Sequence, residues 1–473
     1  SEQQRQISKN SDWYDAKLVA DKPSRLSAVI FFSLLAGGIL AVIVFGAADV
    51  WALGLMSLLV GAIVVLWLVD SWRNEVFFFN TNPMQISLLG LVLIGLIQLL
   101  PLGNSAVSTD LLGVPAVNTL SLAPYLTRFA IVQLVVYLVF FAAALTFINN
   151  QKRLRKAVVT VIIFGALMAF FGILQRLANV DGIYGARKTS EAVTFASYVN
   201  QNHFAALMEM TIGLTLALLF GNATNKDKRI FLIAAAAVMG IAIVFTGSRG
   251  GLVSLLAVLG FIVAANLLKR QDDGENVSED GEKRSNFRRN LAYIVGGLTV
   301  IFGLFGAAIM LGADESLIRG VGLTANEQDV SHGRTHFWNT ALKIISDYPI
   351  LGTGLDSFGV TFTRYDTWNG IWRVEQAHND YLQILADAGI LGFICVLSFI
   401  FLLFKQSLRI IGKTSDNFRR STAIGGLAGC FGIIVYSFFD FPLRTPANGY
   451  FFLLFAVLAT ATINYPKLYR KRK

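Results

Sequence analysis

The sequence predicts an all-α polytopic membrane protein with about twelve transmembrane helices. Of its 473 residues, 55% are hydrophobic and only 15% are charged, which leaves too little polar surface for a soluble protein of this size. The apolar residues form runs long enough to cross roughly 30 Å of hydrocarbon. The net charge of +10 comes from basic residues clustered in short segments between these runs, as in membrane proteins. This distribution argues against a nucleic-acid-binding protein.

The apolar runs place the membrane-spanning helices along the chain. In order, the predicted spans are residues 26–46, 51–69, 84–101, 128–148, 157–177, 198–220, 229–246, 250–268, 291–311, 388–404, 421–438 and 447–464. The first 25 residues are polar, and no small-residue cleavage site follows the first apolar run. We therefore expect no cleavable signal peptide, and the first run stays as a helix.

The distribution of basic residues predicts the orientation of these helices. With the N-terminus in the cytoplasm, 29 of the 40 Lys and Arg residues fall in cytoplasmic segments, so both termini are predicted to be cytoplasmic. The loop at 269–290 is polar and mixed in charge, which predicts disorder. The predicted order is a cytoplasmic tail (1–25), nine helices (26–311), an outer loop (312–387), three helices (388–464) and a basic cytoplasmic tail (465–473).

The outer loop is predicted to be structured and helical. Apolar residues recur at i, i+3, i+4 and i+7, which predicts an amphipathic helix on the outer membrane–water boundary: Trp338, Ala341, Leu342 and Ile345. Pro349, Gly352 and Gly354 are expected to end this helix. A structured loop of this size is the expected place for a functional site.

Arginine supplies most of the charge on the predicted outer side. Its guanidinium binds phosphate or carboxylate through two parallel hydrogen bonds and stays charged when partly desolvated. An anionic group at the membrane edge, such as a lipid pyrophosphate, is the ligand that this pattern suggests. The arginines concerned are Arg176, Arg187, Arg249, Arg319, Arg334, Arg364, Arg373 and Arg444.

Two of these arginines lie in distinctive surroundings. Arg249 is in TGSRGG, between two apolar runs, where glycines let a ligand approach the backbone. The alternative is a tight helical hairpin with an arginine that reaches the membrane surface. Arg334 is in SHGRTHFW, where it binds either a phosphate or lipid headgroups. His332 and His336 flank Arg334 at metal-ligand spacing, but no third ligand is evident, so we predict no metal.

His378, in VEQAHNDYLQ, is the candidate general base, because a neutral imidazole can accept a proton from a hydroxyl. Asp380 is expected either to orient this ring or to cap the following helix. Glu375, three residues earlier, could form a metal-ligand pair with the histidine. The alternative for His378 is an interfacial histidine whose hydrogen bonds serve only the structure.

Two further polar groups lie close to the predicted outer ends of helices. His203 begins a span that also carries Glu209, and an intramembrane carboxylate is a functional candidate. The alternative is a structural hydrogen bond on the face that Glu209 shares with Asn202. Asp440 and Arg444 are expected to form a structural ion pair.

Several known chemistries have no motif in this sequence. It contains no Walker loop, no dinucleotide-binding glycine pattern, no HExxH and no D-x-D pair in the predicted outer loops. We therefore predict no cofactor and no metal, and arginine would have to neutralise a leaving group's charge. Cys395 and Cys430 lie in apolar runs and are expected to be small buried residues.

Taken in order, these motifs resemble the O-antigen ligase and polymerase superfamily. The resemblance covers roughly the second half of the chain and is carried by VNQNHFA, TGSRGG, HGRTHFWNTALKIISDYPILGTGLDSF, QAHNDYLQILADAGILGF and SFFDFPLRTPANG. It implies a GT-C-type glycosyltransferase of the bacterial inner membrane, whose active site faces the periplasm. Such enzymes take a glycan from undecaprenyl pyrophosphate without a metal and pass it to lipid A–core, to another lipid-linked glycan or to protein.

The resemblance also implies roles for individual residues. His378 matches the family's proposed catalytic histidine, and Arg249 and Arg334 match the arginines thought to hold the pyrophosphate. We predict an inverting transfer, ligase-like with lipid A–core as the acceptor; a polymerase or a protein-glycosylating enzyme is the alternative. The candidate supporting residues are Arg176, His203, Asp380, Arg364 and Arg373.

Two other classes of protein compete with this hypothesis. A lipid-glycan transporter also needs arginines, but they should line a path through the membrane, whereas the candidates here gather on the predicted outer face. A structural scaffold of an envelope complex leaves Arg249 unexplained. Transport in vesicles without an acceptor separates a transporter from an enzyme.

Overall fold

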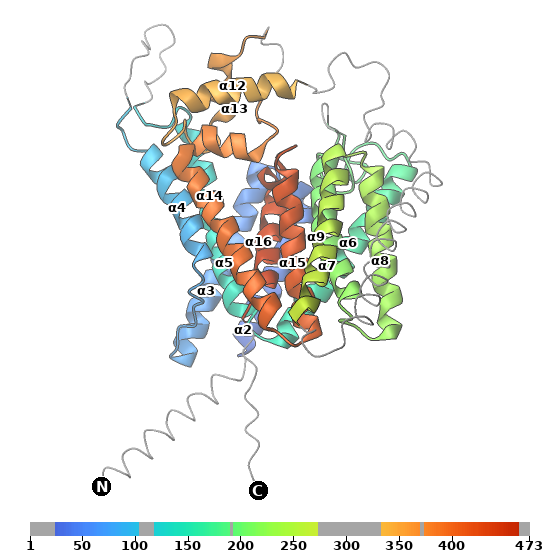
Figure 1. The fold of residues 1–473 in the computed structure, drawn as a ribbon. Helices are drawn as coiled ribbons and strands as arrows, with labels where there is room; N and C mark the ends of the chain where they lie inside the picture. Colours follow the sequence, from blue (N-terminus) through green and yellow to red (C-terminus); the bar gives the residue numbers. More distant parts are fainter. Residues whose placement is uncertain (1–23, 104–117, 190–192, 273–332, 369–372, 463–473) are drawn as a thin grey trace, which may run out of the picture.

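A computed structural model describes residues 24–103, 118–189, 193–272, 333–368 and 373–462. These segments contain thirteen α-helices and two short 3-10 helices, and no β-strand runs through them. Most helices stand side by side in one bundle, and three short helical pieces cover one end of it (Figure 1). The predicted all-α architecture is confirmed for the described part of the chain.

Eleven of the twelve predicted spans are helices: α2 (Arg25–Ile43), α3 (Val50–Asn74), α4 (Met84–Gln98), α5 (Pro124–Phe147), α6 (Gln151–Leu177), α7 (Gln201–Phe220), α8 (Lys226–Phe245), α9 (Arg249–Asp272), α14 (Asp380–Lys413), α15 (Asn417–Tyr436) and α16 (Pro446–Thr460). The span expected at 291–311 lies outside the described residues. Eight of these helices are long and apolar enough to cross a membrane, and α4 and α16 are shorter apolar helices of 15 residues. The protein is thus a multi-pass membrane protein, whereas the total of twelve and the orientation remain predictions.

Several helices begin before the predicted apolar runs, α2 by one residue and α6 by six, where polar residues cap them. Ser24 accepts a hydrogen bond from the backbone N–H of Ser27, and Asn150 accepts one from Arg153, at the starts of α2 and α6. At the other extreme, α9 continues through Asp272. The first four residues of the loop predicted to be disordered are therefore helical, and residues 273–290 lie outside the described part.

The centre of the bundle is α7, which is buried over almost its whole length. Glycines of α15 allow the two helices to approach closely. A Cβ atom on Gly425 would lie 2.7 Å from the Cα atom of Leu214, and one on Gly429 would lie 3.0 Å from the Cα atom of Met210. The backbones of α7 and α15 are therefore in direct contact, and α15 fixes the position of α7 against the rest of the bundle.

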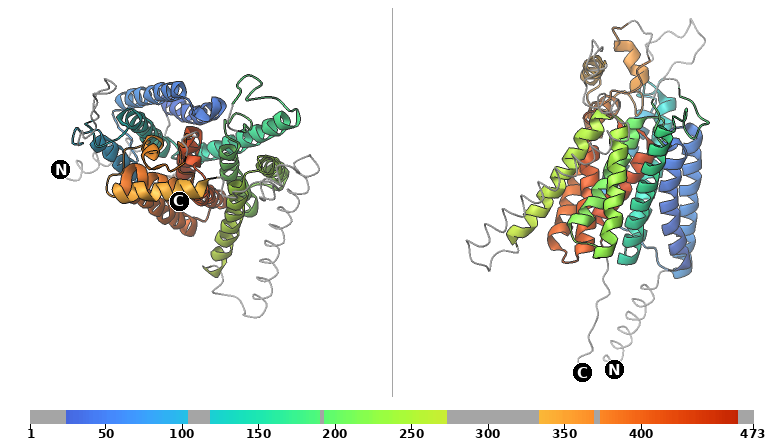
Figure 2. Two further views of the ribbon diagram at one scale, coloured as in Figure 1. Left: turned by 90° about the horizontal axis from the view of Figure 1, so that it is seen from above. Right: turned by 90° about the vertical axis from the view of Figure 1, so that its right-hand side faces the viewer.

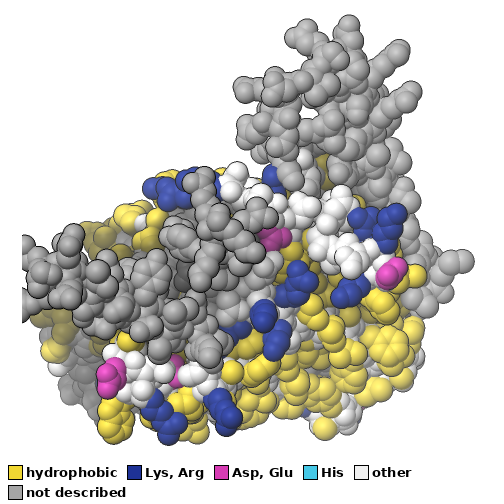
Figure 3. Space-filling view, turned by 90° about the horizontal axis from the view of Figure 1, so that it is seen from below, with side chains coloured by type: hydrophobic (Ala, Val, Ile, Leu, Met, Phe, Trp, Pro, Cys, Tyr) yellow, Lys and Arg dark blue, Asp and Glu magenta, His cyan; other side chains and the backbone are white. Residues whose placement is uncertain are grey.

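Arginines close one end of the bundle. Arg153 at the start of α6 donates to the Ser27 hydroxyl of α2 and to the Phe147 carbonyl, and Arg419 of α15 donates to carbonyl oxygens at the end of α16. Figure 3 shows this end, with several Lys and Arg side chains and few acidic ones among the described residues. This end is the one that the positive-inside rule assigns to the cytoplasm.

The opposite end is covered by α12 (Arg334–Asp347), α13 (Phe358–Tyr365) and the first turns of α14 (Figures 1 and 2). The predicted amphipathic helix is confirmed as α12, and three of the four residues of its predicted stripe turn inward: Ala341 is buried, and Trp338 and Ile345 are half-buried. The fourth, Leu342, is 53% exposed, and Ile344 is buried in its place against α13 and α14. The difference arises because α12 packs on other helices of the protein, and this packing selects a face rotated from the predicted one.

A turn after α12 is fixed to a break in α14. Gly389 has φ +63° and interrupts α14, so that residues 380–388 form a short helix and residues 390–413 form the membrane-crossing part. The N–H of Ile390 donates to the Pro349 carbonyl at 2.8 Å, and the N–H of Gly354 donates to the Asp387 carbonyl at 3.0 Å. Pro349 and the glycines after it end α12, as predicted, and hold the outer helices on α14.

Candidate active site

His378 lies directly before α14, on a backbone held in an unusual conformation. Its φ is +51°, in the left-handed region that few non-glycine residues adopt. The next residue, Asn379, caps α14 by accepting hydrogen bonds from the N–H groups of Tyr381 and Leu382 at 3.0 and 3.1 Å. The cap fixes where the helix begins and therefore fixes the direction in which the imidazole projects.

Asp440 is the partner of His378. Its carboxylate lies 3.2 Å from the His378 Nδ1 atom and is almost fully buried, while the His378 side chain is 31% exposed. Burial alone would raise the pKa of Asp440, but the hydrogen bond to His378 and the charges of His203, His378 and Arg334 outweigh burial and lower that pKa to about 2. Because an ionised carboxylate only accepts hydrogen bonds, it favours the tautomer of His378 with the proton on Nδ1 and an unprotonated Nε2.

Asp380 was predicted to orient this ring or to cap α14, and both predictions are wrong. The Asp380 carboxylate accepts a hydrogen bond from the Ser437 hydroxyl at 2.9 Å, Asp440 orients the ring, and Asn379 is the cap. The reason is that residues 378–380 run beside the 437–441 loop. This pairing brings Asp440 to the histidine and turns Asp380 to the other side.

The Asp440 carboxylate also connects α7 to the site. Asn202 donates from Nδ2 to the Asp440 Oδ2 atom at 2.9 Å, and its own carbonyl accepts from the Tyr436 hydroxyl at 2.9 Å. The Tyr436 hydroxyl lies 2.5 Å from the hydroxyl of Ser248, which is the residue before Arg249. This chain of hydrogen bonds connects His378 to the start of α9. A Cβ on Gly250 would lie 2.1 Å from the Tyr436 ring, so the glycine after Arg249 is needed for this contact.

Arg334 of α12 lies close enough for its charge to act on the Asp440 carboxylate. It begins that helix after Gly333, whose φ of +80° suits glycine. Its positive charge contributes to lowering the pKa of Asp440. Three residues along α12, the Phe337 ring stacks on His378 at 5.9 Å between centroids. Arg249, Arg334 and His378, which are far apart in the sequence, therefore gather at one end of the bundle, and each arginine begins a helix.

His203 lies behind His378, across one aromatic ring. Both imidazoles meet the Phe441 ring edge-on, at 4.8 and 4.7 Å. The His203 Nδ1 atom bonds the Thr445 hydroxyl, and its buried Nε2 atom has no partner among the described residues. His203 supports the loop that carries Asp440, and Glu209 lies deeper in α7, fully buried.

The predicted Asp440–Arg444 ion pair is wrong. Arg444 instead donates to Asp356 at 2.8 Å and to Asp387 at 2.5 Å. Burial would lower the pKa of Arg444, but the carboxylates of Asp387, Asp356 and Asp380 outweigh it and raise that pKa above its usual value. Arg444 points away from Asp440 because the 3-10 helix η2 (Pro442–Arg444) turns the chain between them.

The remaining predicted site residues lie apart from His378. Arg373 is exposed and pairs with Glu375 at 3.2 Å, which also occupies the carboxylate proposed as a metal partner for the histidine. Arg364 is exposed at the end of α13, and Arg176 borders a separate polar cavity at the end of α6. None of these three side chains has a described contact with His378 or Asp440.

The histidines around Arg334 are the ones with metal-ligand spacing in the sequence. His336 pairs with Asp366 at 2.7 Å and stacks on Trp368, so its ring is already engaged. His332 lies outside the described residues. Within the described ranges, no three His, Cys, Asp or Glu side chains are grouped as they would be around a metal ion.

A family model described as O-antigen ligase matches residues 234–397. The matched segment runs from α8 into α14 and contains Arg249, Arg334 and His378. The match confirms the resemblance to the O-antigen ligase and polymerase superfamily and supports a glycosyltransferase-type membrane enzyme with lipid-linked glycan and acceptor substrates. No curated protein matches the chain.

The matched segment supplies only part of the candidate site. Asn202, Tyr436 and Asp440 complete it from outside the matched segment. Sequence reasoning assigned Asp440 to an ion pair and gave Tyr436 no role. The available signal was that Asp440 and Asn202 are polar side chains at the predicted outer ends of apolar helices, but their mutual contact spans 238 residues of sequence.

Proposed function

We propose that this protein is a metal-independent inverting glycosyltransferase that moves a glycan from a lipid pyrophosphate to an acceptor hydroxyl. The observation that carries the proposal is the pairing of His378 with the ionised, buried Asp440, beside Arg334. A partly exposed imidazole with a carboxylate on Nδ1 is equipped to accept a proton at Nε2. The donor is undecaprenyl-pyrophosphate-linked glycan, as the superfamily resemblance implies.

The arginines are assigned to the leaving group. Arg249 and Arg334 each begin a helix, where the helix dipole adds to the charge of the guanidinium. Such a site favours an anion and stabilises the negative charge that develops on a departing pyrophosphate. The Ser248–Tyr436–Asn202–Asp440 connection supports a fixed separation between the arginine at α9 and the base.

The reaction balances without a further reactant. The acceptor hydroxyl gives its proton to the Nε2 atom of His378, and its oxygen attacks the anomeric carbon from the face opposite the pyrophosphate. The new C–O bond forms as the bond to the phosphate oxygen breaks, and the electron pair leaves with the pyrophosphate. Asp440 stabilises the imidazolium that results, and one attack from the opposite face inverts the anomeric carbon.

The test is reconstitution in vesicles with undecaprenyl-pyrophosphoryl glycan and each candidate acceptor. Attachment to lipid A–core indicates a ligase, which is the first candidate, and a ladder of lengthening lipid-linked glycan indicates a polymerase. His378→Ala is expected to lower transfer by about 100-fold or more while donor binding and the unfolding temperature stay close to wild type. Wild-type turnover in this variant would show that the role of His378 is wrong.

The same vesicles test the transporter alternative. Without an acceptor, the enzyme is expected to leave the donor on the side where it was added. Movement of the donor across the bilayer, unaffected by His378→Ala, would favour a lipid-glycan transporter instead. Protease or thiol accessibility of the outer loop tests whether the site faces the periplasm, as we propose.

A further inference from the structure

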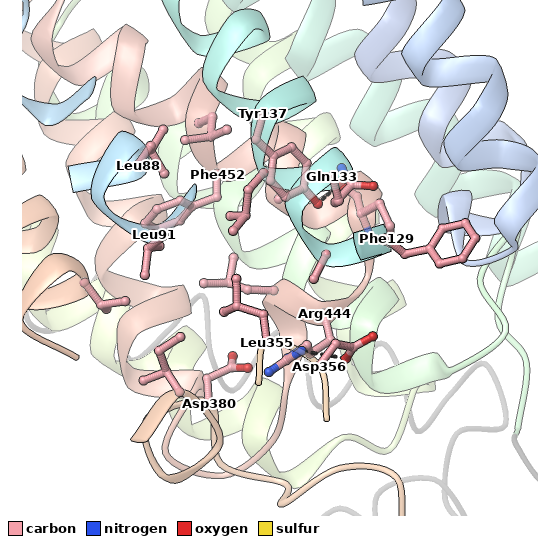
Figure 4. A pocket seen from close by; sticks show the side chains of 18 of the residues that line it. Leu88, Leu91, Phe129, Gln133, Tyr137, Leu355, Asp356, Asp380, Arg444 and Phe452 are labelled. Atoms are coloured by element: carbon pink, nitrogen blue, oxygen red, sulfur yellow. Dashed lines mark hydrogen bonds and ion pairs between the residues drawn. The ribbon is translucent and has the colours of Figure 1, made fainter. Parts of the chain in front are cut away.

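Two cavities among the described helices differ in the character of their walls. An apolar groove of about 490 Å³ lies among α3, α4, α5, α14, α15 and α16, with Leu88, Leu91 and Phe452 in its walls (Figure 4). A second cavity, of about 350 Å³, lies at the end of α6, and its accessible wall is mostly polar. Lipid chains can cover an apolar wall in a membrane, whereas a polar hollow needs water or a polar ligand.

The polar cavity lies at the same end of the bundle as the candidate site. Helix α6 begins at the basic end, and its 27 residues at 1.5 Å each extend about 40 Å to the opposite end. There the last turns of α6, the turn at 180–182, Thr189 and the segment 193–196 form the walls of the cavity. None of these residues lines the apolar groove, so the two cavities are separate.

One short segment connects the polar cavity to the candidate base. The N–H of Gln201, at the start of α7, donates to the Val193 carbonyl at 2.8 Å, so the cavity wall lies against the first turn of α7. The next residue, Asn202, donates to Asp440, which holds His378. No lining residue of the cavity has a described contact with His378 itself. The cavity is therefore beside the support of the base and apart from the reacting atoms.

The walls of the polar cavity are held by contacts behind them. Gln175 donates from Nε2 to the Gly182 carbonyl at 2.9 Å, which closes the turn after α6. Phe195 packs on α6 where Gly172 leaves room, since a Cβ atom on this glycine would lie 2.3 Å from the ring. Walls fixed in this way keep the cavity open. A ligand that enters it spends little of its binding free energy on ordering the protein.

The wall of the polar cavity offers both donors and acceptors of hydrogen bonds. Its polar side chains are Gln175, Arg176, Asn179, Asp181, Thr189 and Thr194. Asp181 is exposed and pairs with Lys188 at 2.6 Å, whereas the half-buried Arg176 guanidinium has no partner among the described residues. A sugar hydroxyl can accept from a guanidinium and donate to an amide or carboxylate oxygen. The volume is at the lower end of the range of about 300–1,000 Å³ for ligand pockets, which suits a sugar ring.

We propose that the polar cavity binds one pyranose ring of a glycan substrate, away from the reacting carbon, with Arg176 and Asn179 as its hydrogen-bonding partners. The inference rests on the proposed function, because the donor glycan and the acceptor core both carry such rings. A glycan seated here and at His378 is held at two points, which increases its affinity without a new contact at the reacting atoms. The cavity thus acts on substrate binding, while His378 and Asp440 act on the proton.

The test measures protection of Arg176 from phenylglyoxal, which modifies accessible guanidinium groups. The full-length protein in phosphatidylethanolamine nanodiscs is treated alone, with the oligosaccharide released from the undecaprenyl-pyrophosphoryl donor, and with the oligosaccharide released from lipid A–core. Mass spectrometry quantifies modification of Arg176 and of Arg128, an exposed arginine at the same end of α5, as an internal reference. One oligosaccharide should slow modification of Arg176 about tenfold at about ten times its Kd, and that of Arg128 not at all. The oligosaccharide that protects identifies the substrate that supplies the ring.

Matched variants establish that the protection comes from the cavity. Thr194→Trp fills the cavity and should abolish protection, whereas Leu174→Trp, at a 48% exposed position of α6 outside the cavity, should not. Arg176→Ala tests the site independently in case Thr194→Trp does not fold. It should raise KM for the substrate that protects by about tenfold and leave kcat within a few-fold, because a contact far from the reacting atoms is equally strong before and in the transition state. Arg128→Ala removes the same charge and should change neither.

The outcomes separate this inference from the proposed function. Arg176 left unprotected by both oligosaccharides overturns the inference, as does equal protection of Arg128 or protection that a folded Thr194→Trp variant retains. Protection needs no transfer, so it should persist in His378→Ala. Protection in a wild-type protein that transfers no glycan contradicts only the proposed function. Active transfer with an unprotected Arg176 contradicts only the inference drawn here.

Discussion

Replacing Asp440 with asparagine tests the pairing on which the candidate site depends. Asp440→Asn keeps the size of the side chain but removes its charge. In the native protein, the carboxylate accepts hydrogen bonds from His378, from Asn202 and from the N–H of Phe441. An asparagine cannot accept all of them, because one end of its side chain is a donor. The imidazole then loses either its orientation or the tautomer with a free Nε2.

The size of the effect follows from the distance in the pair. At 3.2 Å and an effective dielectric constant of about 20, the attraction between an imidazolium and this carboxylate is about 5 kcal/mol. Solvent weakens it, since His378 is 31% exposed, but half of it still corresponds to roughly 100-fold in rate. We expect kcat to fall by about 100-fold or more, with little change in KM for the donor, because Asp440 carries no contact assigned to the pyrophosphate.

The assay is steady-state transfer in vesicles, corrected for the folded fraction of each variant. The control is Asp366→Asn, which removes the carboxylate from the other described His–Asp pair, at His336, and should leave kcat within a few-fold of wild type. If Asp440→Asn retains kcat within a few-fold while His378→Ala is inactive, the carboxylate does not orient the base. Equal losses in the two Asn variants would indicate a general effect on the outer helices.

The remaining predictions concern charge, packing and pH. Arg334→Ala should lower kcat/KM for the donor by roughly 100-fold, and Arg334→Lys should restore part of the loss; equal activity of all three proteins would remove Arg334 from the site. Gly250→Ala should lower the unfolding temperature, because its Cβ would lie 2.1 Å from Tyr436, at a cost of about 1–3 kcal/mol. Gly260→Ala on the same helix meets open space and should cause no loss. Asp440 has a folded pKa of about 2, below its ordinary value of 3.8, so it contributes about 2 kcal/mol of stability above pH 4, which is lost as the pH falls towards 2. The stability difference between wild type and Asp440→Asn should therefore shrink over that interval in acid-unfolding curves, and a constant difference would contradict the assignment.

The sequence predicted much of the site but few of its contacts. His378, Arg249 and Arg334 were selected because charged or titratable groups at membrane edges are costly, and the structure brings all three to one end of the bundle. The errors concern partners. Asp380 is two residues from His378 and Asp440 is 62 residues away, yet Asp440 makes the bond. Sequence spacing favours local partners, whereas the packing of α15 beside α14 decides the actual ones.

Two features depend on tertiary structure for a physical reason. The buried face of α12 follows from the helices that it packs against, and an amphipathic pattern alone does not distinguish a protein neighbour from a membrane surface. An apolar groove lined by α3, α4, α5, α14, α15 and α16 is invisible in the sequence, because its walls come from six helices whose lining residues are apolar like the rest of each span. Whether an apolar side chain contacts lipid, protein or a cavity depends on its neighbours.

The sequence by itself determined that this protein crosses a membrane many times, because apolar runs of this length are stable in the hydrocarbon core of a bilayer and unstable in water. It also determined which charged residues require an explanation. Only the tertiary structure decided that Asp440 holds His378, that Arg444 belongs with Asp356 and Asp387, and that an apolar groove lies among α4, α5, α14 and α16. Hydrophobicity is a property of each segment, whereas hydrogen bonds and cavities arise between segments that folding alone brings together.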